Sequence, residues 1–335
     1  MSMVASFPTI KRSVFIDVFD KALCENRLRE LNPEQKIITK NFIIDPARVK
    51  IKLDKKMIEA NRALLNQQFP NFQAVTNKIF DNLLLTTLSE TKGIKFQPLL
   101  MVGEPGIGKT YYTSRLTALL DVPKIAIDLA AATSGFVFTG TSSKWGNASI
   151  GNIAKLLMTQ KICNGIVILD EVDKTKSSFS NGSDPLLALL SLLEQHSAKE
   201  FRDEFLEFSI DAAELNYIAT ANDISDIPNY ILSRFDVCKI EKLDDAQIKD
   251  VAKTTYTNLL TELEIEDTFS AVLSQSAIDE ICNVSDVRQL KKVITNAMVS
   301  AARDSRHRIL KRDVVKSLDG LEPVEKTKLP IGFVH

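Results

Sequence analysis

The 335-residue sequence predicts an α/β fold, a doubly wound, five-stranded parallel sheet that is followed by a C-terminal all-helical region. Two observations predict it. Five short runs that are almost entirely apolar alternate with longer stretches of helical periodicity, and beyond residue 244 only helical patterns remain. Strands that are apolar on both faces are typical of a parallel sheet covered by helices on both sides. Ligands of such sheets bind at the carboxyl ends of the strands.

Each element of this fold has its own signal. The five apolar runs predict strands at 98–102, 124–129, 165–169, 216–221 and 237–240. Apolar residues at helical spacing predict two helices before the first strand, at 54–67 and 72–90, and four after the last, at 245–262, 275–284, 288–303 and 311–318. We therefore expect an N-terminal segment of unknown role over 1–70, an α/β domain over 71–243, a helical domain over 244–320 and a tail over 321–335.

Charge and composition exclude several classes of protein. Lys plus Arg number 42 and Asp plus Glu 43, a net charge of −1, which is atypical of a protein that mainly coats nucleic acid or an anionic membrane. The N-terminus lacks the apolar core of a signal peptide, and no apolar run reaches the roughly 18 residues of a membrane helix. The four cysteines form no CxxC and lie far from the three histidines, so no zinc site or disulfide framework is indicated. We expect a cytoplasmic protein without a membrane partner.

A phosphate-binding loop follows the first predicted strand. The segment GEPGIGKT at 103–110 fits GxxxxGK[ST] at every fixed position and precedes a helical stretch, a context that an ordinary glycine turn does not require. Its glycines let backbone N–H groups turn toward phosphate oxygens, Lys109 supplies a positive charge, and the Thr110 hydroxyl can ligate Mg²⁺. We predict ATP and Mg²⁺ as cofactors. The predicted nucleotide contacts are Gly103, Glu104, Pro105, Gly106, Ile107, Gly108, Lys109, Thr110 and Tyr111.

Polar residues follow the third and fourth predicted strands. The third ends in ILDEVDK, where Asp170 can hold Mg²⁺ and Glu171 can orient and deprotonate the attacking water. A solvated acidic pair is the alternative, but together with the phosphate loop these residues indicate nucleotide hydrolysis. The fourth strand ends in Asn222, whose amide can hydrogen-bond the γ phosphate or the water; a turn-forming asparagine is the alternative.

Two arginines are further candidates. Arg234, in the loop before the fifth strand, could pair with a surface acid or reach the γ phosphate bound by a neighbouring subunit. Arg288 opens a helix of the C-terminal region, where a plain surface cation is the alternative.

The motifs GEPGIGKT, ILDEVDK, IATAN, SRF and VRQL, in this order, resemble those of the AAA+ ATPases. GSDPLLALLSLLEQ and IPNYILSRFDV resemble more narrowly the ATPase module of the Lon protease family, although Ser183 interrupts the Gly-Asp-Pro of that family. The resemblance covers about residues 70–320. It implies that the helical region is a lid, and that Phe72 lies near the adenine, for which core packing is the alternative. The other implied roles are Walker A for Lys109 and Thr110, Walker B for Asp170 and Glu171, sensor 1 for Asn222, a finger acting in trans for Arg234, and sensor 2 for Arg288.

The resemblance also implies a hexameric ring with a central pore. An aromatic residue on the segment 136–151 would line it, which points to Trp145, the only tryptophan; a packed tryptophan is the alternative. Phe179 could belong to a second pore loop. Because the sequence ends soon after the last predicted helix, we expect no room for the serine and lysine peptidase domain of Lon.

Three functions remain open. The first is an ATP-driven remodeller that acts as a homo-oligomer on an unidentified protein partner, without a protease of its own. The second is a nucleic-acid motor or loader, suggested by eight basic residues between 288 and 313, although a solvated helix face is the commoner explanation. The third is a nucleotide-gated assembly switch in a sensor or defence complex, which needs the ATP site but no pore aromatic.

Overall fold

The computed structural model describes residues 14–31, 33, 36, 46–132, 134–145, 148–175, 184–282, 284 and 287–320, with only the backbone of 287 and 288. The chain divides into two compact units, Met1–Lys242 and Leu243–His335. Among the described residues, every helix is too short or too polar to cross a lipid bilayer.

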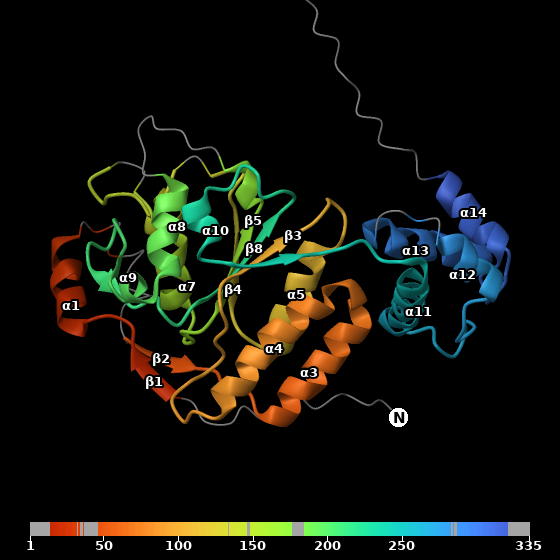
Figure 1. The fold of residues 1–335 in the computed structure, drawn as a ribbon, viewed down its shortest axis with the longest axis horizontal. Coiled ribbons are helices and arrows are strands. Elements are labelled where there is room, and N and C mark those ends of the chain that lie inside the picture. Colours follow the sequence, from red (N-terminus) through yellow and green to blue (C-terminus); the bar gives the residue numbers. More distant parts are fainter. Residues whose placement is uncertain are drawn as a thin grey trace, which may run out of the picture. The chain divides into compact units, whose positions relative to one another are not determined.

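The first unit is built on a five-stranded parallel sheet (Figure 1). Its strands are β3 (Leu99–Val102), β4 (Lys124–Asp128), β5 (Ile166–Asp170), β8 (Asn216–Ala221) and β9 (Asp236–Lys239), in the order β4-β5-β8-β3-β9. This confirms the predicted fold class. Because β8 lies between β3 and β5, the loop after β3, the residue after β8 and the acids at the end of β5 meet at one edge of the sheet.

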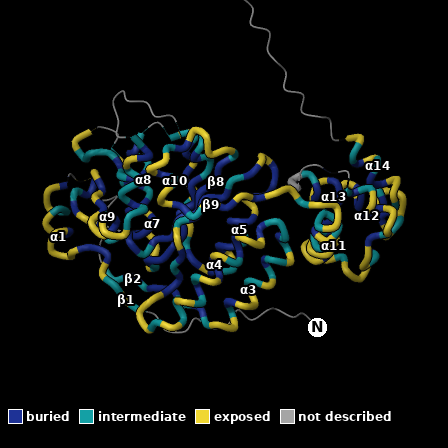
Figure 2. The backbone as a smooth tube through the Cα atoms, viewed as in Figure 1, coloured by how far each residue is buried: buried dark blue, intermediate teal, exposed yellow. Residues whose placement is uncertain are grey.

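Helices cover both faces of this sheet (Figure 1). The helices α3 (Lys55–Gln68), α4 (Gln73–Thr87) and α5 (Lys109–Leu120) pack on one face, and α6 (Phe136–Thr139), α7 (Asn152–Thr159), α8 (Pro185–Leu193) and α10 (Asn229–Leu232) on the other. Strand β5 illustrates how one strand contributes side chains to the apolar cores on both faces of the sheet. Ile166 and Ile168 face the α3–α5 side, whereas Val167 and Leu169 face the α7–α8 side, because successive strand side chains alternate. Figure 2 shows the resulting buried centre.

The described part of the N-terminal segment belongs to the same compact unit as the sheet. Strands β1 (Val14–Asp17) and β2 (Ala47–Lys50) form an antiparallel pair, and α1 (Lys21–Glu30) follows β1. Phe19 and Cys24 enter the core on the α7–α8 side, and Ile58 enters the core on the other side. The predicted helix at 54–67 is confirmed. The β1–β2 pair and the short pair β6 (Phe201–Arg202) and β7 (Ser209–Ile210) were not predicted.

The second unit is all-helical. Its helices are α11 (Asp245–Glu262), α12 (Gln275–Ile281), α13 (Val287–Arg303) and α14 (Lys311–Asp319), which confirms the four predicted helices. Asp244 and Gln247 form a capping box at the start of α11. A separate apolar core that includes Tyr256, Ile294 and Val314 holds the unit together.

Candidate active site

The loop between β3 and α5 has the backbone of a phosphate site. Gly106 and Gly108 have φ values of 88° and 103°, which favour glycine. A side chain at Gly103 would bring its Cβ to 2.9 Å from the carbonyl oxygen of Ile240. Gly108 is also the N-cap of α5, and the first N–H groups of a helix have no acceptor within the helix. Glycines at 106 and 108 therefore let the backbone N–H groups of this turn face an anion.

Lys109 connects this loop with the end of β8. Its ammonium donates to the carbonyl oxygens of Gly103 (2.5 Å) and Glu104 (3.3 Å) and to Oδ1 of Asn222 (3.1 Å). The side chain is only 9% exposed. The structure thus brings two of the predicted site residues, Lys109 and Asn222, into direct contact.

The other loop residues differ in their surroundings. Thr110 is exposed on the first turn of α5, and Glu104 pairs with Lys242 at 2.8 Å. Pro105 is exposed, while Ile107 is buried in the core on the α3–α5 side. Tyr111 is exposed and its ring contacts that of Phe69 at a centroid distance of 5.4 Å.

Asp170 is held by Thr220, a residue that the sequence did not single out. The Thr220 hydroxyl donates to Oδ1 of Asp170 (3.1 Å) and accepts from the backbone N–H of Glu171 (3.2 Å). Burial raises the pKa of Asp170, and the charges of Asp128 and Glu171 add to this, while Thr220 and Lys109 oppose it. The pairing of β5 with β8 places position 220 beside 170, so the contact depends on a strand order that the sequence does not reveal.

Glu171 occupies a conformation that is uncommon for a residue with a side chain. Its φ and ψ are 58° and 49°, in the left-handed region, which costs roughly 1–2 kcal/mol. Its carboxylate pairs with Lys174 at 2.8 Å, across the short helix η2 (Val172–Lys174). Both side chains are half-exposed, and such pairs contribute little free energy. The carboxylate therefore remains available to a water molecule.

Asp173 is a second residue at the candidate site that the motifs did not predict, although it lies in the segment ILDEVDK. Its Oδ2 accepts from the backbone N–H of Asn222 at 3.1 Å. Its Oδ1 is buried and has no hydrogen-bond partner among the described residues. Buried polar atoms without a protein partner usually bind water or an ion.

The oxygen atoms at this edge suit Mg²⁺. The Asp170 carboxylate, the Thr110 hydroxyl and the unpaired Asp173 oxygen are the hard ligands that this ion prefers. The described residues include no group of three or more His, Cys, Asp or Glu that could hold a metal by itself. In nucleotide sites Mg²⁺ is bound by one or two protein ligands and completes its shell with phosphate oxygens and water. The residues present fit that type of site.

Phe72 lies under the phosphate loop. Its ring stacks on that of Tyr112 at 4.5 Å and 9°, and it is almost fully buried. A Cβ placed on Gly108 would be 4.0 Å from Cε2 of Phe72. Core packing is therefore observed, and contact of Phe72 with the adenine stays a prediction.

Arg234 lies at the other edge of the sheet. It precedes β9, whereas Lys109 follows β3, and these two strands are parallel neighbours. Its guanidinium donates to Oε1 of Glu194 through Nη2 (2.6 Å) and Nε (3.1 Å), so the pairing with a surface acid is observed. The structure therefore does not bring Arg234 to the site of its own chain. Arg288 lies in α13 of the second unit, and its side chain is outside the described residues.

Trp145 is 56% exposed on the loop between α6 and α7, so it is not a core residue. Its ring contacts Phe136 edge-to-face at 5.6 Å. The base of the loop is tight, because a Cβ on Gly151 would lie 2.1 Å from the carbonyl oxygen of Phe138. Phe179 lies outside the described residues.

Side chains brace the same loop. Asp203, which is buried, accepts from the backbone N–H of Gly151 at 2.9 Å. Arg27 of α1 donates through Nη2 to Oγ of Ser143 and to Oε1 of Glu207, both at 2.7 Å. Helix α1 of the N-terminal segment thus helps to hold the loop that presents Trp145.

The basic run of the second unit is partly neutralised. Arg306 pairs with both Asp304 and Asp313, and Arg312 also pairs with Asp304. Lys291 pairs with Glu262. The fourth paired cation of the run, Lys311, contacts Glu280. Four of the seven cations whose side chains the structure describes are therefore matched by acids, which is unlike a continuous phosphate-binding face.

Comparison with known proteins agrees with this geometry. The family model for the "ATPase family associated with various cellular activities (AAA)" matches residues 99–241. The Lon protease of Finegoldia magna is 26% identical over 295 residues, which are 83% of this chain and 37% of that protein. The Lon protease of Clostridium beijerinckii is 29% identical over 71% of this chain and 30% of its own length. The chain spans about a third of the length of these relatives.

Solved structures show the same fold. Hsp104 of S. cerevisiae, in a complex with casein, has a TM-score of 0.62 and 15% identity, over 78% of this chain and 52% of that one. A RuvB variant of Thermotoga maritima has a TM-score of 0.51 and 15% identity, over 73% and 70%. At this identity the likeness concerns the fold alone. Motifs, site geometry and relatives together identify residues 99–241 as an AAA ATPase domain, an ATP-hydrolysing module, and the chain is similar to the Lon proteases over this ATPase region.

Proposed function

We propose that this ATPase works with Mg²⁺ as a hexameric ring and uses ATP hydrolysis to unfold or remodel a protein partner. The loop 103–110 binds the phosphates, with Lys109 beside them. The residues 71–243 form the ATPase domain, and the second unit, with Arg288, acts as its lid. Support comes from a chain of contacts at one edge of the sheet: Lys109 contacts Asn222, Asn222 contacts Asp173, and Thr220 contacts Asp170 and Glu171.

The chain's own residues divide the chemistry. Lys109 holds phosphate charge, and Glu171 accepts the proton of the attacking water. Thr220 orients Asp170, and Asn222 stands between Lys109 and Asp173, where its amide can respond to the loss of a phosphate. Bound Mg²⁺ would neutralise charge on the phosphate oxygens, with Asp170 and Thr110 as its protein ligands.

A ring accounts for the position of Arg234. This residue lies at the edge opposite to its own phosphate loop, so it can serve only the nucleotide of a neighbour. Its present partner, Glu194, forms a half-exposed pair that costs little to break. An arginine that reaches the γ phosphate in trans accelerates hydrolysis by roughly 10³–10⁵.

The exposed Trp145 is the observation that favours a protein substrate over the other two functions. A large aromatic ring on a braced loop, outside the core, is suited to grip an extended polypeptide, and neither of the other functions needs it. The solved structure of Hsp104, which shares this fold, contains casein, and we therefore choose casein as the probe of protein binding. The half-neutralised basic run gives no separate support to a nucleic-acid motor.

The test is the variant Trp145→Ala, assayed for ATPase activity and for binding of fluorescein-labelled casein in ATP. We expect basal hydrolysis within about two-fold of the unaltered protein, because Trp145 lies outside the phosphate site. Casein stimulation of the ATPase should disappear, and casein affinity should fall by about ten-fold, the value of one buried aromatic contact of roughly 1–1.5 kcal/mol.

The matched control is Phe15→Ala, which removes another exposed aromatic ring far from the loop in sequence. It should leave casein binding and stimulation unchanged. Unaltered casein stimulation in Trp145→Ala, or a protein that does not respond to casein at all, would contradict threading.

A further inference from the structure

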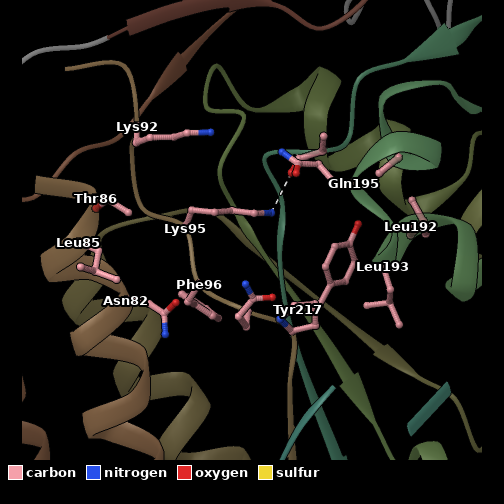
Figure 3. Close-up of a pocket in the computed structure, with 14 residues that line it drawn as sticks. Asn82, Leu85, Thr86, Lys92, Lys95, Phe96, Leu192, Leu193, Gln195 and Tyr217 are labelled. Atoms are coloured by element: carbon pink, nitrogen blue, oxygen red, sulfur yellow. Dashed lines mark hydrogen bonds between the residues drawn. The ribbon is translucent and has the colours of Figure 1, made fainter. Parts of the chain in front are cut away.

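A pocket of about 380 Å³ lies at the amino edge of the sheet, away from the phosphate loop (Figure 3). Its walls come from α4, the segment before β3, the end of α8, helix α9 (Gln195–Lys199) and the start of β8. The volume is in the range of small-molecule sites. Nothing in the ATPase chemistry uses this pocket.

Two hydrogen-bond donors in this pocket lack full partners. Tyr217 is 3% exposed, and its hydroxyl has no hydrogen-bond partner in the described part of the chain. Lys95 donates to the carbonyl oxygens of Ala213 (2.8 Å) and Leu215 (2.6 Å), which uses two of the three N–H groups of an ammonium. Figure 3 shows both side chains reaching the pocket from different elements, the segment before β3 and strand β8.

The charge of the pocket is positive. None of the fourteen lining residues is acidic, two are lysines (Lys92 and Lys95), and seven are apolar. Burial lowers the pKa of Lys95 to about 8; Glu214 and Asp211 oppose this, and Lys92 and Lys50 add to it. Glu214 is itself paired with Lys50 at 2.9 Å. A part-buried ammonium that lacks a paired carboxylate would be stabilised by an anion.

We propose that this pocket binds a small organic carboxylate with an apolar body. The two carboxylate oxygens accept from the Lys95 ammonium and the Tyr217 hydroxyl, and the apolar body packs against side chains such as Leu85, Phe96 and Leu193. A carboxylate fits better than a phosphate, because half of the lining is apolar and the buried Tyr217 and the part-buried Lys95 offer one donor for each of two oxygens.

The site borders the segment that holds Arg234. Leu193 and Gln195 line the pocket on either side of Glu194, the acid that pairs with Arg234. Pro98, another lining residue, accepts at its carbonyl oxygen from the backbone N–H of Asp236 at 2.8 Å. If Arg234 acts as proposed above, a bound carboxylate changes the ATPase rate.

The experiment uses ¹⁹F NMR line broadening with 4-fluorobenzoate, and with 4-fluorobenzamide as the uncharged probe of the same shape. We expect benzoate to bind at least ten-fold more tightly than benzamide. Tyr217→Phe should weaken benzoate binding by about five-fold, the value of one hydrogen bond, without loss of stability, because it removes an unpartnered hydroxyl. Lys95→Met should weaken it by more than ten-fold. Tyr230→Phe, outside the pocket, is the matched control.

Equal broadening by the two probes, no broadening by benzoate at millimolar concentration, or unchanged benzoate binding in Tyr217→Phe overturns the site. The ATPase assay is a separate arm. A benzoate effect on the rate that Tyr217→Phe abolishes supports the link to Arg234; benzoate binding with an unchanged rate overturns that link and leaves casein-dependent remodelling, tested through Trp145, unaffected.

Discussion

A single hydroxyl joins the two acids of the active site. Thr220 donates to the carboxylate of Asp170 and accepts from the backbone of Glu171, which has a strained, left-handed conformation. The first contact orients the Asp170 carboxylate and the second holds the backbone of Glu171, and catalytic rates are sensitive to such positioning. Thr220 is therefore a positioning residue that acts through Asp170 and Glu171.

The variant Thr220→Val tests this role, because valine keeps the shape and removes the hydroxyl. We expect kcat to fall by about ten-fold, the value of one lost hydrogen bond to a charged group. Since the Thr220 hydroxyl lowers the pKa of Asp170, its removal should also move the acidic limb of the pH–rate profile to higher pH. Steady-state ATPase rates between pH 5 and 8 measure both effects.

Thr117→Val is the control, because Thr117 is equally buried but its hydroxyl donates to the carbonyl oxygen of Ser114 within α5, away from the two acids. It should change neither kcat nor the pH profile. An unshifted profile in Thr220→Val would show that the hydroxyl does not act on Asp170.

The motifs predicted Lys109, Asp170, Glu171 and Asn222, because each of these residues lies within a few positions of the end of a strand that the sequence itself indicates. They did not predict Thr220 or Asp173, whose contacts cross between strands β5 and β8. A pair of residues 50 positions apart cannot be matched until the strand order and register are known.

At the scale of elements, the helices of the second unit depend on one buried ion pair. The Asp313 carboxylate accepts from Arg306 through two bonds of 2.8 Å and from Ser300 and the backbone of Leu310 at the start of α14. Arg306 is one of the cations that the sequence offered as a nucleic-acid contact. The structure gives it a role in joining α13, the following turn and α14.

Asp313→Asn should therefore lower the free energy of unfolding by about 3 kcal/mol at pH 7, because it leaves a guanidinium without its buried partner. Arg306 lowers the pKa of Asp313 to about 2. A lowered folded-state pKa stabilises the protein above the ordinary carboxyl pKa of about 4, and this contribution is lost as the pH falls from about 4 to about 2. The difference between the variant and the unaltered protein should shrink over that window in urea unfolding followed by circular dichroism.

Asp304→Asn is the control, because Asp304 pairs with the same arginine but is exposed. We expect its effect to be far smaller. Equal losses for the two variants, or a loss at Asp313 that does not depend on pH, would contradict this account.

The boundaries of elements were predictable where the pattern was strong. Helix α11 begins and ends at the residues that the periodicity predicts, and the five strands coincide with the five apolar runs of the sequence to within one or two residues. The β1–β2 pair was not predictable, because each strand has four residues and its partner lies about 30 residues away. Such a pairing depends on the core that covers it and not on its own sequence.

At the scale of the whole molecule, the sheet separates two halves of the proposed catalytic site. Lys109, Asp170, Glu171 and Asn222 lie at the carboxyl edge, and Arg234 lies at the amino edge. In the proposed mechanism a complete site then needs two chains, which is the reason for proposing a ring. The sequence motifs predicted the members of this set, but only the strand order shows that one chain cannot unite them.

The most direct test of this shared site mixes two inactive variants, Lys109→Ala and Arg234→Ala, and measures ATP hydrolysis. Each alone should be nearly inactive, since one lacks the phosphate ligand and the other the arginine worth roughly 10³ in rate. A 1:1 mixture should regain about a quarter of the unaltered rate, because half of the sites keep Lys109 and half of those meet an intact Arg234. A mixture no more active than its two components would contradict a site shared between chains.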